Sequence, residues 1–467
     1  MALAEGCTLM LNLNHKDLVE ATTPAWKLMQ RFQESQQSAV EVTAALLERI
    51  QEKEPRIQAM TLLTPELAMQ QARTADANYK AGTPRALEGV PVTIKDTFDL
   101  AGYVTTKGSR VFKHHHALEH SGVIRRLYNA GAVFLGKTNT AEFGQSATNE
   151  NKLGLVTGNP WDIEKTPGGS SGGAAASVAA GYAPIALGAD GGGSIRIPAA
   201  MTGVFGFKPS YGLCPDEGGF RAMSDFACAG PLTTCVADAR LFLSVLAERE
   251  FHRAPDGLKR FRIGYCESLD GQPVDPAIRA AVSNVATVLS RMGHQVDSID
   301  PSFSGWEQSF GPLVLAEEWR ERGHLLTYCE NELTDYELSS LRAAQTLTPE
   351  QVRDARQKQL EYQAKVARLF ESYDYLLTPT VATPAFTIGE RPSHVDGKKV
   401  SRLWGAFPFT SPFNVAGVPA AAIPCGVERG LPLSAQLVGA YQTDEALLNL
   451  CEALESELNF QTYSDGV

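Results

Sequence analysis

The N-terminal part of the chain shows the pattern of an amphipathic helix. In residues 38–54, "SAVEVTAALLERIQEKE", apolar positions recur every three or four residues, as they do on the buried face of a helix. Ser38 and Glu41 form the Ser-x-x-Glu pattern of a capping box, and Pro55 is expected to end the helix. The apolar residues predicted to share one face are Val42, Leu46 and Ile50.

Short apolar strands then alternate with helices. Residues 89–100, "GVPVTIKDTFDL", have the apolar, β-branched pattern of a buried strand, with Lys95 at its far end. Residues 123–135 predict a helix, a glycine stop and a strand. A small-residue helix over 171–180, followed by a strand to Leu187, repeats that plan. The alternation predicts an α/β fold with helices on the faces of a sheet.

Between about residues 250 and 400 the chain becomes more helical and more charged. Thr348 as N-cap, Pro349 at the first helical position and Gln351 closing the box predict a long helix. Proline-stiffened loops and strands follow, and we find no internal repeat or linker. The apolar residues expected on one face of the long helix are Val352, Ala355, Tyr362, Val366 and Leu369.

Composition narrows the class of protein. The 467 residues are 43% hydrophobic and 20% charged, and the net charge of −11 argues against a nucleic-acid or anionic-membrane binder. The eight cysteines include no C-x-x-C pair, which is typical of reduced thiols in a cytoplasmic protein. Residues 1–17 lack a signal-peptide pattern, and no run of about 18 apolar residues predicts a membrane span.

Residues 188–199, "GADGGGSIRIPA", place three glycines directly before Ser194. A flexible linker fits poorly because apolar sequence follows at once. A phosphate loop fits poorly because no Gly-Lys-Ser/Thr closes the run and the spacing is not G-x-G-x-x-G. A third interpretation is that the N–H groups of Gly191, Gly192, Gly193 and Ser194 converge on a developing oxyanion beside a serine nucleophile.

A second glycine-rich stretch, "PGGSSGG" at 167–173, places Ser170 and Ser171 at a helix start. Helix capping alone would explain serines at that place. Together with Ser194 and Lys95, however, they make a chemical set that capping does not explain. A serine nucleophile needs a base.

The histidines are poor candidates for that base because they avoid both glycine loops. The one dense cluster, "KHHHALEH", gives His116 and His120 the i, i+4 spacing of metal ligands, but no third ligand motif supports a metal site. Lysine can serve instead if burial lowers its pKa from about 10.4 towards 7 or 8, which costs roughly 4 kcal/mol. Lys95, where a buried strand meets a polar loop, fits that requirement.

These stretches carry a resemblance to a known family. "GGSSGGAAASVAAG" followed by "GADGGGSIRIPA" resembles the amidase signature pattern, and "GVPVTIKD", "GPLTTCVADA" and "FNVAGVPAAAIPCG" extend the similarity. The resemblance implies a Ser–cis-Ser–Lys triad, with Ser194 as nucleophile, Ser170 as bridging serine and Lys95 as base. "FGQSA", which places Gly144 and Gln145 beside the substrate, departs from the usual A-M-G-S-S.

The resemblance also implies one large α/β domain, residues 1–467, around a central mixed β-sheet covered by helices on both faces. Within it, residues 38–245 would hold the catalytic motifs, 250–400 a more variable helical region on the substrate side, and 400–455 a return to the sheet.

The expected function is hydrolysis of small amides, with carbamates or esters as further substrates, through an acyl-enzyme on Ser194. The expected partner is the small-molecule substrate, with no metal, organic cofactor or nucleic acid, and a homodimer is left open. The alternative is an amidase-like subunit of a tRNA-dependent amidotransferase. Residues 404–414, "WGAFPFTSPFN", weigh against it because they offer no carboxylate to grip the amino group of glutamine.

Overall fold

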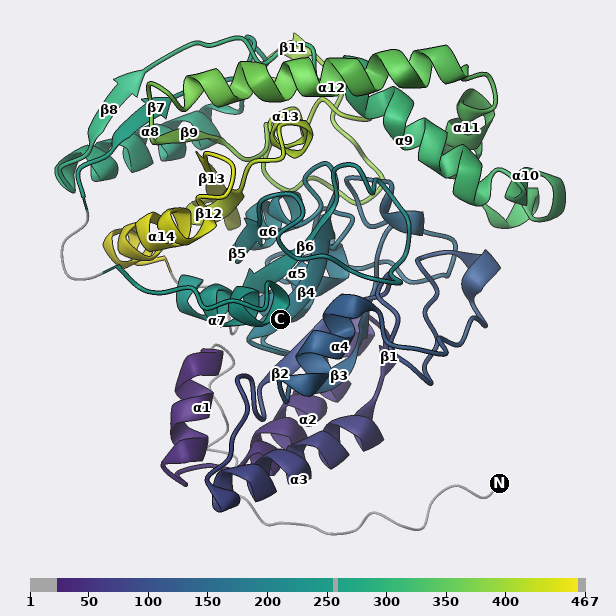
Figure 1. The fold of residues 1–467 in the computed structure, drawn as a ribbon, viewed down its shortest axis with the longest axis vertical. Helices are drawn as coiled ribbons and strands as arrows, with labels where there is room; N and C mark the ends of the chain where they lie inside the picture. Colours follow the sequence, from purple (N-terminus) through teal and green to yellow (C-terminus); the bar gives the residue numbers. More distant parts are fainter. Residues whose placement is uncertain (1–22, 255–258, 461–467) are drawn as a thin grey trace.

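A computed structural model describes residues 23–254 and 259–460 of the chain. The expectation about an N-terminal signal, on residues 1–17, lies outside these ranges. The fold is built on one large mixed sheet with helices on both faces, which confirms the expected fold class (Figure 1). β10 (His394–Val395) and β11 (Lys398–Lys399) form a separate two-stranded sheet. Among the helices of the described ranges, none is both long and apolar enough to cross a bilayer.

The sheet has eleven strands, and its centre combines parallel and antiparallel pairs. The strand that ends in Lys95 runs parallel to both of its neighbours. In spatial order the strands are β1 (Met60–Leu63), β3 (Val133–Thr138), β2 (Pro91–Lys95), β4 (Ile185–Asp190), β6 (Cys228–Thr233), β5 (Phe205–Lys208), β12 (Ala420–Glu428), β13 (Leu431–Gly439), β9 (Tyr375–Pro379), β7 (Arg262–Tyr265) and β8 (Gln295–Ser298).

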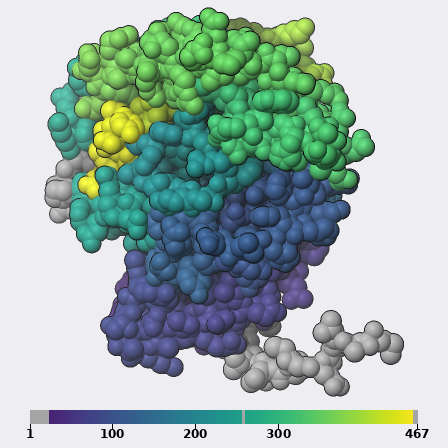
Figure 2. Space-filling view, turned by 45° about the vertical axis from the view of Figure 1, so that its right-hand side comes forward, coloured from purple at the N-terminus to yellow at the C-terminus, as the bar shows by residue number. Residues whose placement is uncertain are grey.

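The helices gather at both ends of the sheet and along its faces (Figure 1). In Figure 2 the green helical segment from α9 to α12 meets the teal and blue part of the chain along a recess in the surface. The helices are α1 (Ala25–Gln33), α2 (Ala39–Ile57), α3 (Pro65–Ala81), α4 (Gly122–Asn129), α5 (Gly172–Ala179), α6 (Arg196–Thr202), α7 (Val236–Leu246), α8 (Pro276–Arg291), α9 (Glu307–Arg322), α10 (Leu325–Tyr328), α11 (Asp335–Ala344), α12 (Pro349–Leu369), α13 (Ser411–Val415) and α14 (Asp444–Leu458).

Both predicted capping boxes are present, at the start of α2 and at the start of α12. The predicted end of α2 is wrong, because Pro55 lies inside the helix, which continues to Ile57. Pro55 lies in the last turn of the helix and has no N–H to donate there. The last turn still closes, because Gln58 takes a left-handed conformation and donates its N–H to the carbonyl of Glu54.

The end of β2 and the end of β4 bring two predicted motifs to one edge of the sheet. The strand predicted over 89–100 is shorter than expected, and β2 stops at Lys95. β4 runs three residues beyond the predicted Leu187 and leads directly into the glycine loop at 191–193. Because neighbouring parallel strands end at the same edge, Lys95 and this loop lie close together.

Candidate active site

Lys95 is a buried amine at the end of β2, with only 2% of its surface exposed. Its Nζ donates to Ser170 Oγ at 2.7 Å and lies 3.4 Å from the carbonyl oxygen of Ala189. Burial lowers the pKa of Lys95 from its ordinary 10.5 to about 7, although the negative charge of Asp190 opposes the change. The amine is therefore partly neutral near neutral pH.

Ser170 lies just before α5 and is 1% exposed, and the Gly169–Ser170 peptide bond is cis. Neither serine of the pair caps the helix through its side chain. Ser171 occupies the N-cap position, but its hydroxyl donates to the carbonyl of Ala189 at 3.2 Å. Helix capping therefore does not explain this motif.

Ser194 stands between β4 and α6 and is 7% exposed. Its loop is fixed by two hydroxyls, because Thr410 and Ser411 both donate to the carbonyl of Gly192, at 2.7 and 2.9 Å. The Gly193 N–H is donated to the carboxylate of Asp190 at 2.7 Å. That donor is engaged, so the expectation that all four N–H groups face an oxyanion does not fit Gly193.

The other three N–H groups of the loop remain available. Within residues 23–254 and 259–460, no hydrogen bond uses the N–H of Gly191, Gly192 or Ser194. Little space surrounds the glycines: a Cβ at Gly191 would stand 2.7 Å from Met223 Sδ, and one at Gly192 would stand 3.1 Å from Phe310 Cζ. A side chain at either position would require Met223 or the Phe310 ring to shift.

A buried ion pair holds the loop from behind. Arg196 and Asp190 are both fully buried, and the Arg196 Nε lies 2.9 Å from the Asp190 carboxylate. Burial alone would raise the pKa of Asp190, but the Arg196 charge reverses this and holds the pKa well below its usual range. The side-chain oxygens of Gln436 and Asn414 and the carbonyl of Thr410 complete the partners of the guanidinium. These contacts tie the glycine loop to the buried ion pair.

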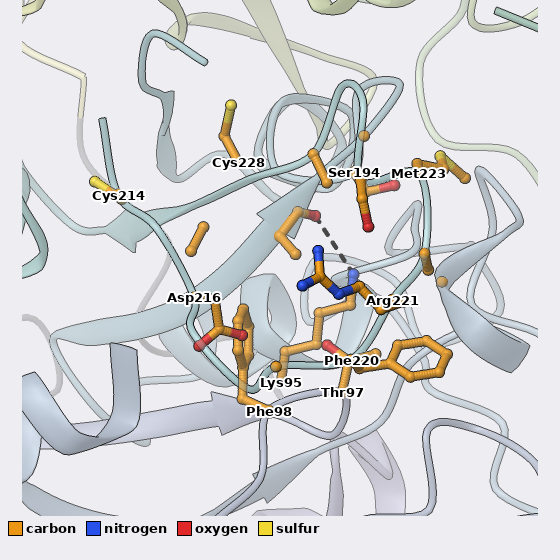
Figure 3. Close-up of a pocket in the computed structure, with 18 of the residues that line it drawn as sticks. Lys95, Thr97, Phe98, Ser194, Cys214, Asp216, Phe220, Arg221, Met223 and Cys228 are labelled. Carbon is orange, nitrogen blue, oxygen red and sulfur yellow. Dashed lines mark hydrogen bonds between the residues drawn. The ribbon is translucent and has the colours of Figure 1, made fainter. Parts of the chain in front are cut away.

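Lys95, Ser170 and Ser194 line one cavity of about 380 Å³ (Figure 3). Gly144 lies beside them, since a Cβ there would stand 3.4 Å from Ser170 Oγ and 3.9 Å from Lys95 Nζ. Gln145 is buried but does not line this cavity. Among the described residues, no hydrogen bond joins the hydroxyl of Ser170 to that of Ser194.

The sequence predictions missed the wall of the cavity formed by residues 211–229. This segment connects β5 to β6 and carries no helical or strand period that would have placed it. His116 and His120, which have the spacing of metal ligands in the sequence, lie outside the cavity. In the described ranges, no group of three or more histidine, cysteine or acidic residues is arranged to hold a metal. The side chains of the missed segment that line the cavity include Asp216, Phe220, Arg221 and Met223.

Known proteins similar to this chain fall into two groups. The sequence relatives include a subunit of the glutamyl-tRNA(Gln) amidotransferase of Carboxydothermus hydrogenoformans, 34% identical over 93% of this chain and 97% of the relative. The corresponding protein of Caldanaerobacter subterraneus subsp. tengcongensis is 31% identical over 92% and 95%.

The similar solved structures include amidases. A bacterial aryl acylamidase matches with a TM-score of 0.85 at 26% identity, over 94% of this chain and 97% of its own. The peptide amidase of Stenotrophomonas maltophilia matches with a TM-score of 0.79 at 25% identity, over 95% and 99%. A family model described as amidase matches residues 41–448. The chain therefore belongs to the amidase signature family, whose members hydrolyse C–N bonds.

Proposed function

We propose that this protein hydrolyses small linear amides through an acyl-enzyme on Ser194, with Ser170 and Lys95 as its proton relay. The observation that carries the proposal is the 2.7 Å contact between Lys95 Nζ and Ser170 Oγ in the cavity that also holds Ser194. A lysine whose pKa lies at about 7 is a competent base at neutral pH.

The relay works in both directions. Ser194 Oγ turns towards Ser170 and attacks the scissile carbonyl carbon, while its proton passes to Ser170 and the Ser170 proton passes to neutral Lys95. The C–N bond then breaks, and the proton returns by the same path to the leaving nitrogen. Water attacks the resulting ester with the same relay as base, which releases the acid and restores Ser194.

The oxyanion would be held by the N–H groups of Gly191, Gly192 and Ser194, since Asp190 occupies the Gly193 N–H. Thr410 and Ser411 support this arrangement because their hydroxyls fix the Gly192 carbonyl and with it the position of the loop. Fixed donors of this kind need no rearrangement when the charge develops.

The region predicted as substrate-side, 250–400, would shape the acyl or amine pocket. Helix α9 brings Phe310 against Gly192, and the Phe310 ring lies 5.0 Å from that of Phe226, centroid to centroid. Its neighbour α11 contributes Leu341 to a cluster beneath Phe143, a residue of the cavity wall. Variation in these helices would therefore change specificity without touching the triad.

A second candidate is an amidase-like role inside a tRNA-dependent amidotransferase, because the sequence relatives are subunits of such an enzyme. Residues 404–414 weigh against it here. They bring buried aromatic rings, Phe407, Phe409 and Phe413, and supply no carboxylate to bind an amino group. An amidotransferase would also need further subunits to use the released ammonia.

A substrate panel separates these two candidates. We expect the purified chain alone to hydrolyse at least one class among aryl amides, primary amides, carbamates and esters, with one acid and one amine, or alcohol for an ester, released per turnover. Free glutamine should be a poor substrate. The second candidate would be favoured if glutamine were the only substrate hydrolysed, and if its hydrolysis required added amidotransferase subunits and tRNA.

Substitution of Ser170 tests the relay. Ser170→Ala removes the bridge but keeps nucleophile and base, so we expect acylation to fall by about 10² to 10⁴-fold while a slow residual rate remains. Stopped-flow or discontinuous amide hydrolysis measures it. Ser171→Ala is the matched control, because that hydroxyl contacts Ala189 and does not line the cavity. Wild-type acylation in Ser170→Ala would reduce Ser170 to a structural residue.

A further inference from the structure

The cavity contains a cation that the proposed mechanism does not use. Arg221 belongs to the segment between β5 and β6, and its guanidinium points into the cavity (Figure 3). Among the described residues, no side chain or carbonyl accepts a hydrogen bond from that guanidinium, and no carboxylate forms an ion pair with it. Its five N–H donors are therefore available to a ligand.

The backbone around Arg221 is nevertheless held in place. Buried Arg322 donates from Nη1 to the Arg221 carbonyl at 2.9 Å. The preceding ring, Phe220, contacts two cations, with Lys107 Nζ at 4.9 Å and the Arg322 guanidinium carbon at 5.5 Å from its centroid. On the other side, the Ser224 N–H is donated to Glu317 at 2.7 Å. The main chain that carries Arg221 is thus anchored while its side chain is free.

The acidic residues of the same segment are already engaged elsewhere. Asp216 accepts the N–H of Val123 at 3.0 Å. Glu217 lies 2.9 Å from the guanidinium of Arg126, and Asp225 pairs with Arg356. Arg221 is therefore left without a carboxylate partner among the described residues, although Asp216 lines the same cavity and the protein as a whole is strongly acidic.

We propose that Arg221 binds a carboxylate of the substrate, so that the preferred substrates are amides that also carry a carboxylate group. The inference rests on the proposed amidase function, because it names the substrate class of that site. The planar guanidinium matches a carboxylate with two parallel hydrogen bonds. The apolar wall formed by Phe98, Phe220 and Met223 would contact the carbon chain between the carboxylate and the scissile amide.

Two fluorophosphonates of equal length, one ending in a carboxylate and one in a methyl group, test this proposal. The measured quantity is the ratio of their rates of modification of Ser194. We expect the wild type to favour the anionic probe by about 10 to 100-fold, the range for a hydrogen bond to a charged group. Arg221→Gln should bring the ratio close to one, and Arg221→Lys should keep part of the preference. Arg73→Gln is the matched control, since Arg73 is exposed on α3 and does not line the cavity.

A binding measurement makes the test independent of catalysis. Calorimetry should show glutaramate, an amide with a carboxylate, binding to Ser194→Ala at least about tenfold more tightly than to the double variant Ser194→Ala/Arg221→Gln. An equal affinity of the two proteins, or an equal probe ratio in wild type and Arg221→Gln, would overturn the proposal. If neither probe modifies Ser194, the proposed hydrolase function fails, and the calorimetric comparison alone decides the role of Arg221.

Discussion

Ser194→Ala is expected to abolish amide hydrolysis, with kcat/KM lowered by at least about 10⁴-fold and no detectable acyl-enzyme. The alanine variant has no oxygen with which to form the covalent bond, while the oxyanion donors and the cavity stay in place. The fold should persist, because the Ser194 hydroxyl has no hydrogen-bond partner among the described residues. Steady-state kinetics and a thermal melting curve of the same preparation measure both properties.

Mass spectrometry supplies the direct version of this test. A serine-reactive phosphonate should modify Ser194 in the wild type and leave Ser194→Ala unmodified. Ser339→Ala serves as a matched control, because this exposed hydroxyl on α11 contacts only the carbonyl of Asp335. Modification of another residue with Ser194 spared would show that the nucleophile lies elsewhere.

The meeting of Lys95 with the glycine loop could be predicted because the information is local. The β-branched run ending in Lys95 and the run ending before Gly191 each predict a strand, and parallel neighbours place their ends together. The motif itself is short and specific, so the sequence alone indicated which serines belong beside that lysine. Both serines line the cavity beside it.

Long-range contacts explain what could not be predicted. Arg221 lies in a segment without a period, and its placement depends on Arg322 and Glu317, about a hundred residues away on α9. The engagement of Gly193 was missed for a different reason. Which N–H the Asp190 carboxylate accepts depends on how Arg196 and Asn414 orient that carboxylate.

Lys95→Arg is expected to be nearly inactive, with kcat/KM lowered by about 10³-fold or more. Arginine keeps the positive charge but cannot lose its proton near neutral pH, so it cannot act as the base. Lys95→Met is the companion variant, because methionine is unbranched, fits an apolar site and carries no charge to bury. Both should be inactive. If Lys95→Met melts at or above the wild-type temperature and is still inactive, the loss belongs to the missing amine and not to misfolding.

The pH dependence of kcat/KM in the wild type also tests whether Lys95 is the base. Because the base is neutral Lys95, kcat/KM for an amide should rise through an apparent pKa of about 7 and then plateau at alkaline pH. The pH dependence of folding stability provides a second test of the lowered pKa of Lys95. The pKa of Lys95 is about 7 in the folded state and 10.5 in the unfolded state, so between these pH values the unfolded chain binds more protons than the folded chain. The stability of the wild type relative to Lys95→Met should therefore rise from about pH 7 to pH 10.5. A rate that rises only near pH 4 to 5, or an active Lys95→Arg, would assign the base to a carboxylate or another group and leave the Lys95–Ser170 contact a structural one.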